Sequence, residues 1–155
     1  MKMKKCNKCK NTEFEIIERS NTYNVKGNTN IEIQERVMQC STCGEIIFNE
    51  ELEKENLEIL FNKYRIEKKL LGPHEIKAIR EKYDLGQRAF AKILGWGEIT
   101  IHRYENNNLI DETHSKMLEL IKEPQNMRTL LEESKDKIGD RKSTRLNSSH
   151  TVVSR

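Results

Sequence analysis

The chain has 155 residues, 35% of them hydrophobic and 34% charged, which is enough for one average domain or two small ones. No stretch approaches the roughly 20 apolar residues of a membrane helix. The lysines that open the chain run into a cysteine pair rather than into the apolar core of a signal peptide. Composition therefore argues against a membrane or secreted protein and favours a cytoplasmic one, in which thiols stay reduced.

The overall charge by itself gives no support for nucleic-acid binding. The net charge is +3, but residues 135–155 carry 6 Lys and Arg against 2 Asp and Glu, which more than accounts for the excess. Residues 73–134 carry 9 basic and 11 acidic residues and are slightly acidic. A DNA-binding function must therefore rest on a motif and on where its charges lie.

Residues 1–49 contain all 4 cysteines, as two CxxC pairs separated by 30 residues: Cys6, Cys9, Cys40 and Cys43. Two residues between cysteines let both sulfurs of a tight turn face one ion, and two such turns complete a tetrahedron of thiolates. Gly44 suits the second turn. The pattern predicts structural Zn²⁺, because a closed four-sulfur shell leaves no open position for catalysis. A rubredoxin-like iron site and a pair of redox-active dithiols remain alternatives.

The remainder of residues 1–49 is typical of short β-strands, which predicts a small zinc-binding β-domain. The strand-forming runs are Phe14–Ile17, Thr22–Val25, Ile31–Ile33, Val37–Met38 and Ile46–Phe48, and Gly27–Asn30 has the composition of a hairpin turn. Residues 50–71 contain no Gly or Pro, and their apolar stripe predicts an amphipathic connecting helix over 50–72.

Residues 73–134 are predicted to form an all-α domain of five helices, so that the fold class is α+β. The expected helices are His74–Tyr83, Gln87–Leu94, Glu98–Asn106, Asp111–Ile121 and one that begins near Pro124. Ala91 is small where two helices cross, and Gly95 supplies the left-handed turn between the second and third helices. This is the pattern of a helix-turn-helix, with Glu98, Ile99, His102 and Arg103 on the side that would enter a major groove.

The stretch LGQRAFAKILGWGEITIHRYENN resembles the repressor-type helix-turn-helix of the Cro/C1 (XRE) class. The resemblance implies that Gln87 lies near a backbone phosphate, that the third helix reads bases, and that Arg80 and Glu105 form a buried structural ion pair. The expected DNA contacts are Gln87, Arg88, Glu98, Ile99, Thr100, His102, Arg103 and Asn107. The chain departs from the class at Gly86, where a capping Ser, Thr or Asn is usual, and at Glu98, which replaces an amide and would accept from cytosine.

Two CxxC pairs, a connecting helix and this motif together resemble the MqsA family of antitoxins, also called YgiT-type zinc-finger antitoxins, over about residues 4–134. The resemblance implies a zinc domain that holds a partner toxin. It also implies a homodimeric helix-turn-helix domain that binds a pseudo-palindromic operator in double-stranded DNA and represses its own operon. The segment GWGEITIHRYENN most resembles members of the family in which a SocA-like (Panacea) domain follows the helix-turn-helix.

Two other functions remain open: a toxin-neutralising module that does not bind DNA, and a plain transcriptional regulator without a toxin. No arrangement of Ser, His and Asp, glycine-rich phosphate loop or paired carboxylates indicates catalysis, so the chain is predicted not to be an enzyme.

Residues 135–155 are expected to form a disordered tail. Within them, Asp140–His150 have no apolar periodicity and resemble the translated product of a sequencing-library adapter. We therefore expect residues 140–155 to be an artefact and the natural gene to continue past about Gly139. The predicted organisation is a zinc domain at 1–49, a connecting helix at 50–72, a helix-turn-helix domain at 73–134 and this tail.

Overall fold

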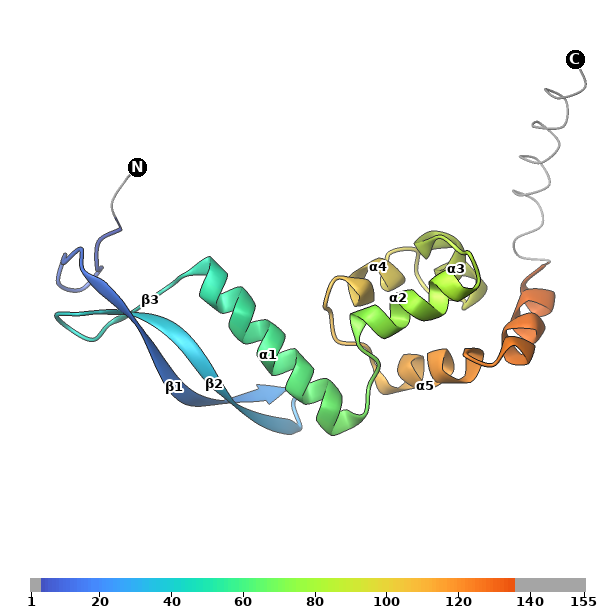
Figure 1. The fold of residues 1–155 in the computed structure, drawn as a ribbon, viewed down its shortest axis with the longest axis horizontal. Coiled ribbons are helices and arrows are strands. Elements are labelled where there is room, and N and C mark those ends of the chain that lie inside the picture. Colours follow the sequence, from blue (N-terminus) through green and yellow to red (C-terminus); the bar gives the residue numbers. More distant parts are fainter. Residues whose placement is uncertain (1–3, 136–155) are drawn as a thin grey trace, which may run out of the picture. The chain divides into compact units, whose positions relative to one another are not determined.

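The structure, a computed structural model, describes residues 4–135 (Figure 1). These residues fall into two compact units that divide between Lys69 and Leu70. The first holds an antiparallel sheet and one long helix, and the second is helical. The prediction of an α+β fold, with a four-cysteine β-domain followed by a helical domain, is confirmed. Lys135 is still helical, and the remainder of the predicted tail, residues 136–155, lies outside the described residues.

A long hairpin forms most of the sheet. β1 (Phe14–Val25) pairs antiparallel with β2 (Thr29–Cys40) in unbroken register, and β3 (Ile46–Ile47) pairs with the end of β2. The short strand-forming runs of the sequence are thus joined through polar residues into two long strands, because cross-strand pairing holds the middle of each strand. Residues 26–28 form the turn, with Lys26 and Gly27 in the left-handed region at φ of 51° and 80°.

α1 (Glu50–Lys68) packs against β2 within the first unit (Figure 1). The side-chain amide of buried Asn56 accepts from the Arg36 N–H (3.0 Å) and donates to the Arg36 carbonyl (2.9 Å). The helix therefore supplies hydrogen-bond partners to the backbone of β2. The apolar residues buried in this unit include Ile31, Ile33, Val37, Leu52, Leu60 and Tyr64. The helix ends before Gly72, because Lys69 adopts a left-handed φ of 53° and donates its N–H to carbonyls of the last turn.

A buried carboxylate interrupts the apolar face of β2. Glu35 is 1% exposed and accepts from Arg19 Nε (2.6 Å), from Asn21 Nδ2 (3.2 Å) and from the hydroxyl of Tyr23. Burial would raise the pKa of Glu35, but hydrogen bonds from Tyr23 and Arg19 lower it below the ordinary glutamate value. The three donors are alternate residues of β1, so only the register of β1 on β2 brings them to one carboxylate.

The second unit is built around one apolar core. It contains α2 (Pro73–Lys82), α3 (Gln87–Ile93), α4 (Thr100–Glu105), α5 (Glu112–Ile121) and a further helical stretch over residues 124–135. The helix ends that the sequence predicted for this unit lie within two residues of the ends in the structure. Core residues that are at most 1% exposed are Ile76, Phe90, Ala91, Ile101, Ile110, Leu118, Ile121 and Met127.

We predict that Glu35→Gln lowers the free energy of unfolding of the first unit by about 2 kcal/mol at neutral pH, because a neutral amide replaces a charged acceptor of several hydrogen bonds. The folded-state pKa of Glu35 lies below its unfolded value, so its stabilisation is present above pH 4.5 and is lost as the pH falls through the folded pKa. Urea unfolding over a pH series should show a weaker acid dependence in the variant. The exposed Glu15→Gln is the matched control, and unfolding curves for Glu35→Gln that match wild type at every pH would contradict the prediction.

Candidate metal centre and nucleic-acid interface

The two CxxC turns bring all four cysteines together. The four Sγ atoms lie within 4.8 Å of one another. Cys6 Sγ is 3.5 Å from Cys43 Sγ, and Cys9 Sγ is 3.5 Å from Cys40 Sγ. Four sulfurs bound to Zn²⁺ at about 2.3 Å each would be spaced by roughly 3.8 Å, so the cluster has the dimensions of a tetrahedral metal site.

The two cysteine turns share one backbone geometry. The N–H of Lys10 donates to the Cys6 carbonyl and the N–H of Gly44 donates to the Cys40 carbonyl, both at 3.0 Å. Lys10 and Gly44 both adopt left-handed φ angles, 65° and 73°. The sequence indicated this conformation only at Gly44, because lysine carries no signal for it. Lys10 follows Cys6 by four residues, as Gly44 follows Cys40, and this equal spacing could have predicted the left-handed conformation of Lys10.

The backbone favours the thiolate at the first cysteine of each pair. The N–H groups of Cys43 and Thr42 lower the pKa of Cys40 to about 6 in spite of burial, and the N–H of Cys9 lowers the pKa of Cys6. The N–H of Glu45 acts to lower the pKa of Cys43, but burial and the neighbouring sulfurs raise it to about 12. Four thiols this close need a cation between them to ionise together, so the donor set suits a soft metal ion.

α3 and α4 follow one another across a tight turn in the second unit. Gly95 adopts a left-handed φ of 73°, and the N–H of Trp96 donates to the Ala91 carbonyl (2.8 Å). Ala91 is fully buried, together with Phe90 and Ile101. The small side chain of Ala91 and the glycine turn therefore occupy the positions at which the sequence placed the crossing of the two helices.

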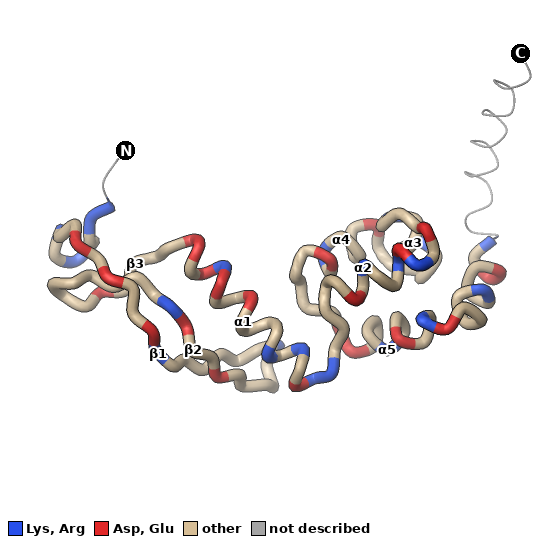
Figure 2. The backbone as a smooth tube through the Cα atoms, viewed as in Figure 1, with Lys and Arg blue, Asp and Glu red and all other residues tan. Residues whose placement is uncertain are grey.

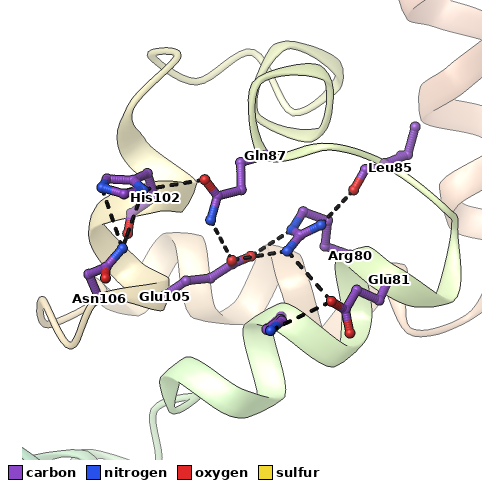
Figure 3. A network of polar contacts seen from close by, with 8 residues as sticks. Arg80, Glu81, Leu85, Gln87, His102, Glu105 and Asn106 are labelled. Atoms are coloured by element: carbon purple, nitrogen blue, oxygen red, sulfur yellow. Dashed lines mark hydrogen bonds and ion pairs between the residues drawn. The ribbon is translucent and has the colours of Figure 1, made fainter.

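A largely buried ion pair links α2 to α4 (Figure 3). Arg80 donates from Nε to Glu105 Oε1 (2.7 Å), from Nη2 to Glu105 Oε2 (3.0 Å), and from Nη1 to the Leu85 carbonyl (2.7 Å). Gln87, the first residue of α3, donates from Nε2 to Glu105 Oε2 (2.6 Å). Burial would raise the pKa of Glu105, but the hydrogen bonds from Arg80 and Gln87 lower it. One carboxylate thus fixes three helices relative to one another.

Two residues expected on the recognition helix precede it in the structure. Glu98 and Ile99 are exposed in the turn before α4, which begins at Thr100, two residues later than predicted. The N–H of Thr100 closes this turn on the Gly97 carbonyl (2.9 Å). Thr100 itself is half-buried. Glu98 and Ile99 therefore flank the start of α4 and do not lie along it.

The other expected DNA contacts differ in their exposure. Arg88, His102 and Arg103 are exposed, whereas Asn107 is half-buried beyond α4 with a left-handed φ of 72°. The side chain of Gln87 is turned toward Glu105 and His102, and its Oε1 lies 3.3 Å from His102 Nδ1 (Figure 3). Both polar atoms of the Gln87 amide therefore contact protein groups. The sequence predicts a phosphate contact for Gln87 and does not predict these two.

An aromatic cluster supports the other side of α4. Trp96 stacks on His114 with ring centroids 3.8 Å apart, and Tyr104 meets both rings edge-on. The hydroxyl of Tyr104 lies 2.7 Å from His114 Nδ1, and burial together with Asp111 raises the pKa of Tyr104 to about 12. Trp96 packs against the core, but its contact with His114 has no signal in the sequence, because residues far apart in the chain meet only after folding.

We predict that Cys40→Ser abolishes metal binding and unfolds the hairpin while leaving the helical unit folded, because the two units have separate cores. Metal content of the purified protein should fall to background, and amide hydrogen exchange should lose protection in β1 and β2 but keep it in α2–α5. Ser41→Ala, an exposed change in the same turn, is the control. Wild-type metal content and hairpin protection in Cys40→Ser would rule out the metal as the element that holds this unit.

Comparison with known protein families gives a match over nearly all of the described residues. The family model for the antitoxin component of bacterial toxin–antitoxin systems, MqsA, matches residues 3–135. No curated protein matches the chain. Among the described residues no helix is long and apolar enough to cross a membrane. The family match gives no support to the SocA-like domain that is expected from the sequence to follow. MqsA is a family of antitoxins and not of enzymes, which confirms the prediction that this chain is not an enzyme. The match spans both the four-cysteine cluster and the helical unit, and the chain belongs to the MqsA antitoxin family.

Proposed function

We propose that this antitoxin is a zinc-stabilised, cytoplasmic repressor that binds an operator in double-stranded DNA as a homodimer and thereby represses its own operon. The observation that carries the proposal is the exposed side of α4 and its preceding turn, which the ion pair of Arg80 and Glu105 and the aromatic cluster hold in place. Exposed side chains on a rigidly held helix are what base reading in a major groove requires.

The exposed residues of this side offer chemistry that matches base edges. The guanidinium of Arg103 can donate two hydrogen bonds to guanine, and the carboxylate of Glu98 can accept from the amino group of cytosine. Ile99 is 53% exposed, although it is apolar, which suits contact with a thymine methyl group. Arg88 is the candidate for a phosphate contact, because it is exposed on α3.

The homodimer is proposed to form through the C-terminal helices. Of the apolar residues on these helices, Leu118, Ile121 and Met127 are buried in the core of the unit itself. Leu120 is 63% exposed and Leu131 is 36% exposed, so these two remain for a partner. A two-fold dimer would place two copies of α4 in successive major grooves, with half-sites about 34 Å apart.

The cysteine cluster is proposed to hold Zn²⁺ and to stabilise the unit that binds the cognate toxin. Its four sulfurs complete a coordination shell, so the metal would act on folding and not on a substrate. The hairpin needs such an element because its interior is small and contains the charged Glu35.

A second candidate function is toxin neutralisation without DNA binding. The charge of the helical region favours it, since residues 73–134 carry 9 basic against 11 acidic residues and acidic side chains are interspersed with basic ones over its helices (Figure 2). DNA binding must then depend on a few well-placed cations and not on a strong positive field.

We predict that the full chain, loaded with zinc, binds a fragment of its own promoter more tightly than a scrambled fragment. Raising the salt concentration should weaken binding to both fragments, because phosphate contacts release counterions. Fluorescence anisotropy at two salt concentrations measures both effects. Equal or absent binding to the two fragments would remove the repressor function and leave the toxin-neutralising module.

We predict that Arg103→Ala weakens binding to the promoter fragment by about 1–3 kcal/mol and loosens sequence preference, because one base contact is lost. Arg128→Ala, which removes an exposed arginine outside α3 and α4, is the matched control and should bind as wild type does. An unchanged binding profile for Arg103→Ala would show that Arg103 does not read a base.

A further inference from the structure

The orientation of the Gln87 amide is determined by the carboxylate beside it. Glu105 is an ionised acceptor, held by two hydrogen bonds from Arg80, so the group of Gln87 that lies 2.6 Å from its Oε2 must be the donor NH₂. The opposite assignment would place the amide oxygen against a carboxylate oxygen. Gln87 Oε1, an acceptor, therefore faces the ring of His102.

This orientation selects one tautomer of His102. Gln87 Oε1 lies 3.3 Å from His102 Nδ1, and two acceptors cannot share a hydrogen bond, so Nδ1 carries the proton. In the neutral ring, Nε2 is then an unprotonated acceptor. The chain of polar contacts runs from the Arg80 cation through Glu105 and Gln87 to the ring of His102 (Figure 3).

Asn106 lies beside the ring of His102 and is held there by the backbone of α4. Its Nδ2 donates to the His102 carbonyl (2.7 Å), which fixes the Asn106 amide with its donor toward His102. The same Nδ2 lies 3.3 Å from His102 Nδ1 and 3.4 Å from His102 Nε2, so it is placed midway between the two ring nitrogens and off the lone-pair direction of either. The lone pair of Nε2 is therefore not taken by Asn106, and because the ring is exposed on α4 beside Arg103, a donor from outside the protein can reach it.

We propose that His102 is a specificity-determining residue. Gln87 holds the ring in the tautomer whose Nε2 accepts a hydrogen bond, and this acceptor favours a base with an amino group at its edge. In the major groove, cytosine N4 and adenine N6 are such donors, whereas the guanine and thymine atoms at the corresponding places are acceptors. Gln87 is the positioning residue. The inference rests on the proposed DNA binding, but the tautomer on which it depends can be measured without DNA.

The first measurement is the tautomer in the free, full-length, zinc-loaded protein. Long-range ¹H–¹⁵N correlation spectra at pH 8, where histidine is ordinarily neutral, distinguish a protonated Nδ1 from a protonated Nε2. We expect His102 in the Nδ1–H form in the wild type and a shift toward a mixture of tautomers in Gln87→Leu. Protonated Nε2 in the wild type would overturn the proposal whatever the protein binds.

The second measurement is selection of binding sites from a library of randomised DNA duplexes, followed by sequencing. Wild type should select cytosine or adenine over guanine and thymine at one position of each half-site, by about tenfold. His102→Ala and Gln87→Leu should lose this preference and keep the preferences at the other positions. His102→Lys, which replaces an acceptor with donors, should move the preference to guanine.

The outcomes distinguish a failure of the proposed DNA binding from a failure of the proposed role of His102. If the wild type selects no sequence, the proposed DNA binding fails. If the wild type selects a motif and His102→Ala selects the same motif with uniformly weaker binding, His102 contacts phosphate and the base-reading inference is overturned. His74→Ala, an exposed histidine at the start of α2, is the matched control, and thermal unfolding confirms that each variant is folded.

Discussion

The buried carboxylate of Glu105 is the contact on which the arrangement of the helical unit depends. It lies on α4, accepts two hydrogen bonds from Arg80 on α2 and one from Gln87 on α3, and so ties three helices to one charge. Removing one partner would leave the others with a buried, uncompensated group, and that penalty makes the arrangement specific. The direction of α4 follows from this contact and from Tyr104, which meets the stacked rings of Trp96 and His114 edge-on.

The first unit meets a different constraint. Its hairpin is long, its interior is small, and one of its inward positions is the carboxylate of Glu35, so hydrophobic burial contributes less than it does in the helical unit. Two devices offset this. The β1 donors Arg19, Asn21 and Tyr23 satisfy Glu35, and the four sulfurs gather where a metal ion would join the segment before β1 to the end of β2. A metal held by the cluster would therefore act on the fold, whatever the unit binds.

The charge distribution limits how the proposed operator binding can work. The helical region is slightly acidic, so long-range attraction to DNA is weak, and recognition would depend on the placement of individual groups. Arg103, Glu98 and His102 differ in what they offer to a base edge: two donors, an acceptor carboxylate and a ring whose acceptor nitrogen Gln87 selects. A surface of this kind favours sequence discrimination over strong non-specific binding.

The sequence alone determined the features that depend on local spacing. Two CxxC pairs indicate a shared metal site, and Ala91 and Gly95 indicate two helices crossing at a turn, because such signals act over a few residues. The ends predicted for the helices of the second unit came within two residues for the same reason, whereas α1 ends at Lys68, four residues before the predicted end at 72. Tertiary structure decided what depends on register and on contacts between distant residues. The joining of short runs into two long strands, the donors around Glu35, and the stack of Trp96 on His114 all arise from pairings across the fold. The engagement of Gln87 by Glu105 and His102 belongs with them: the residue type suggested a polar contact, but an amide can donate or accept, and only its neighbours in space select which.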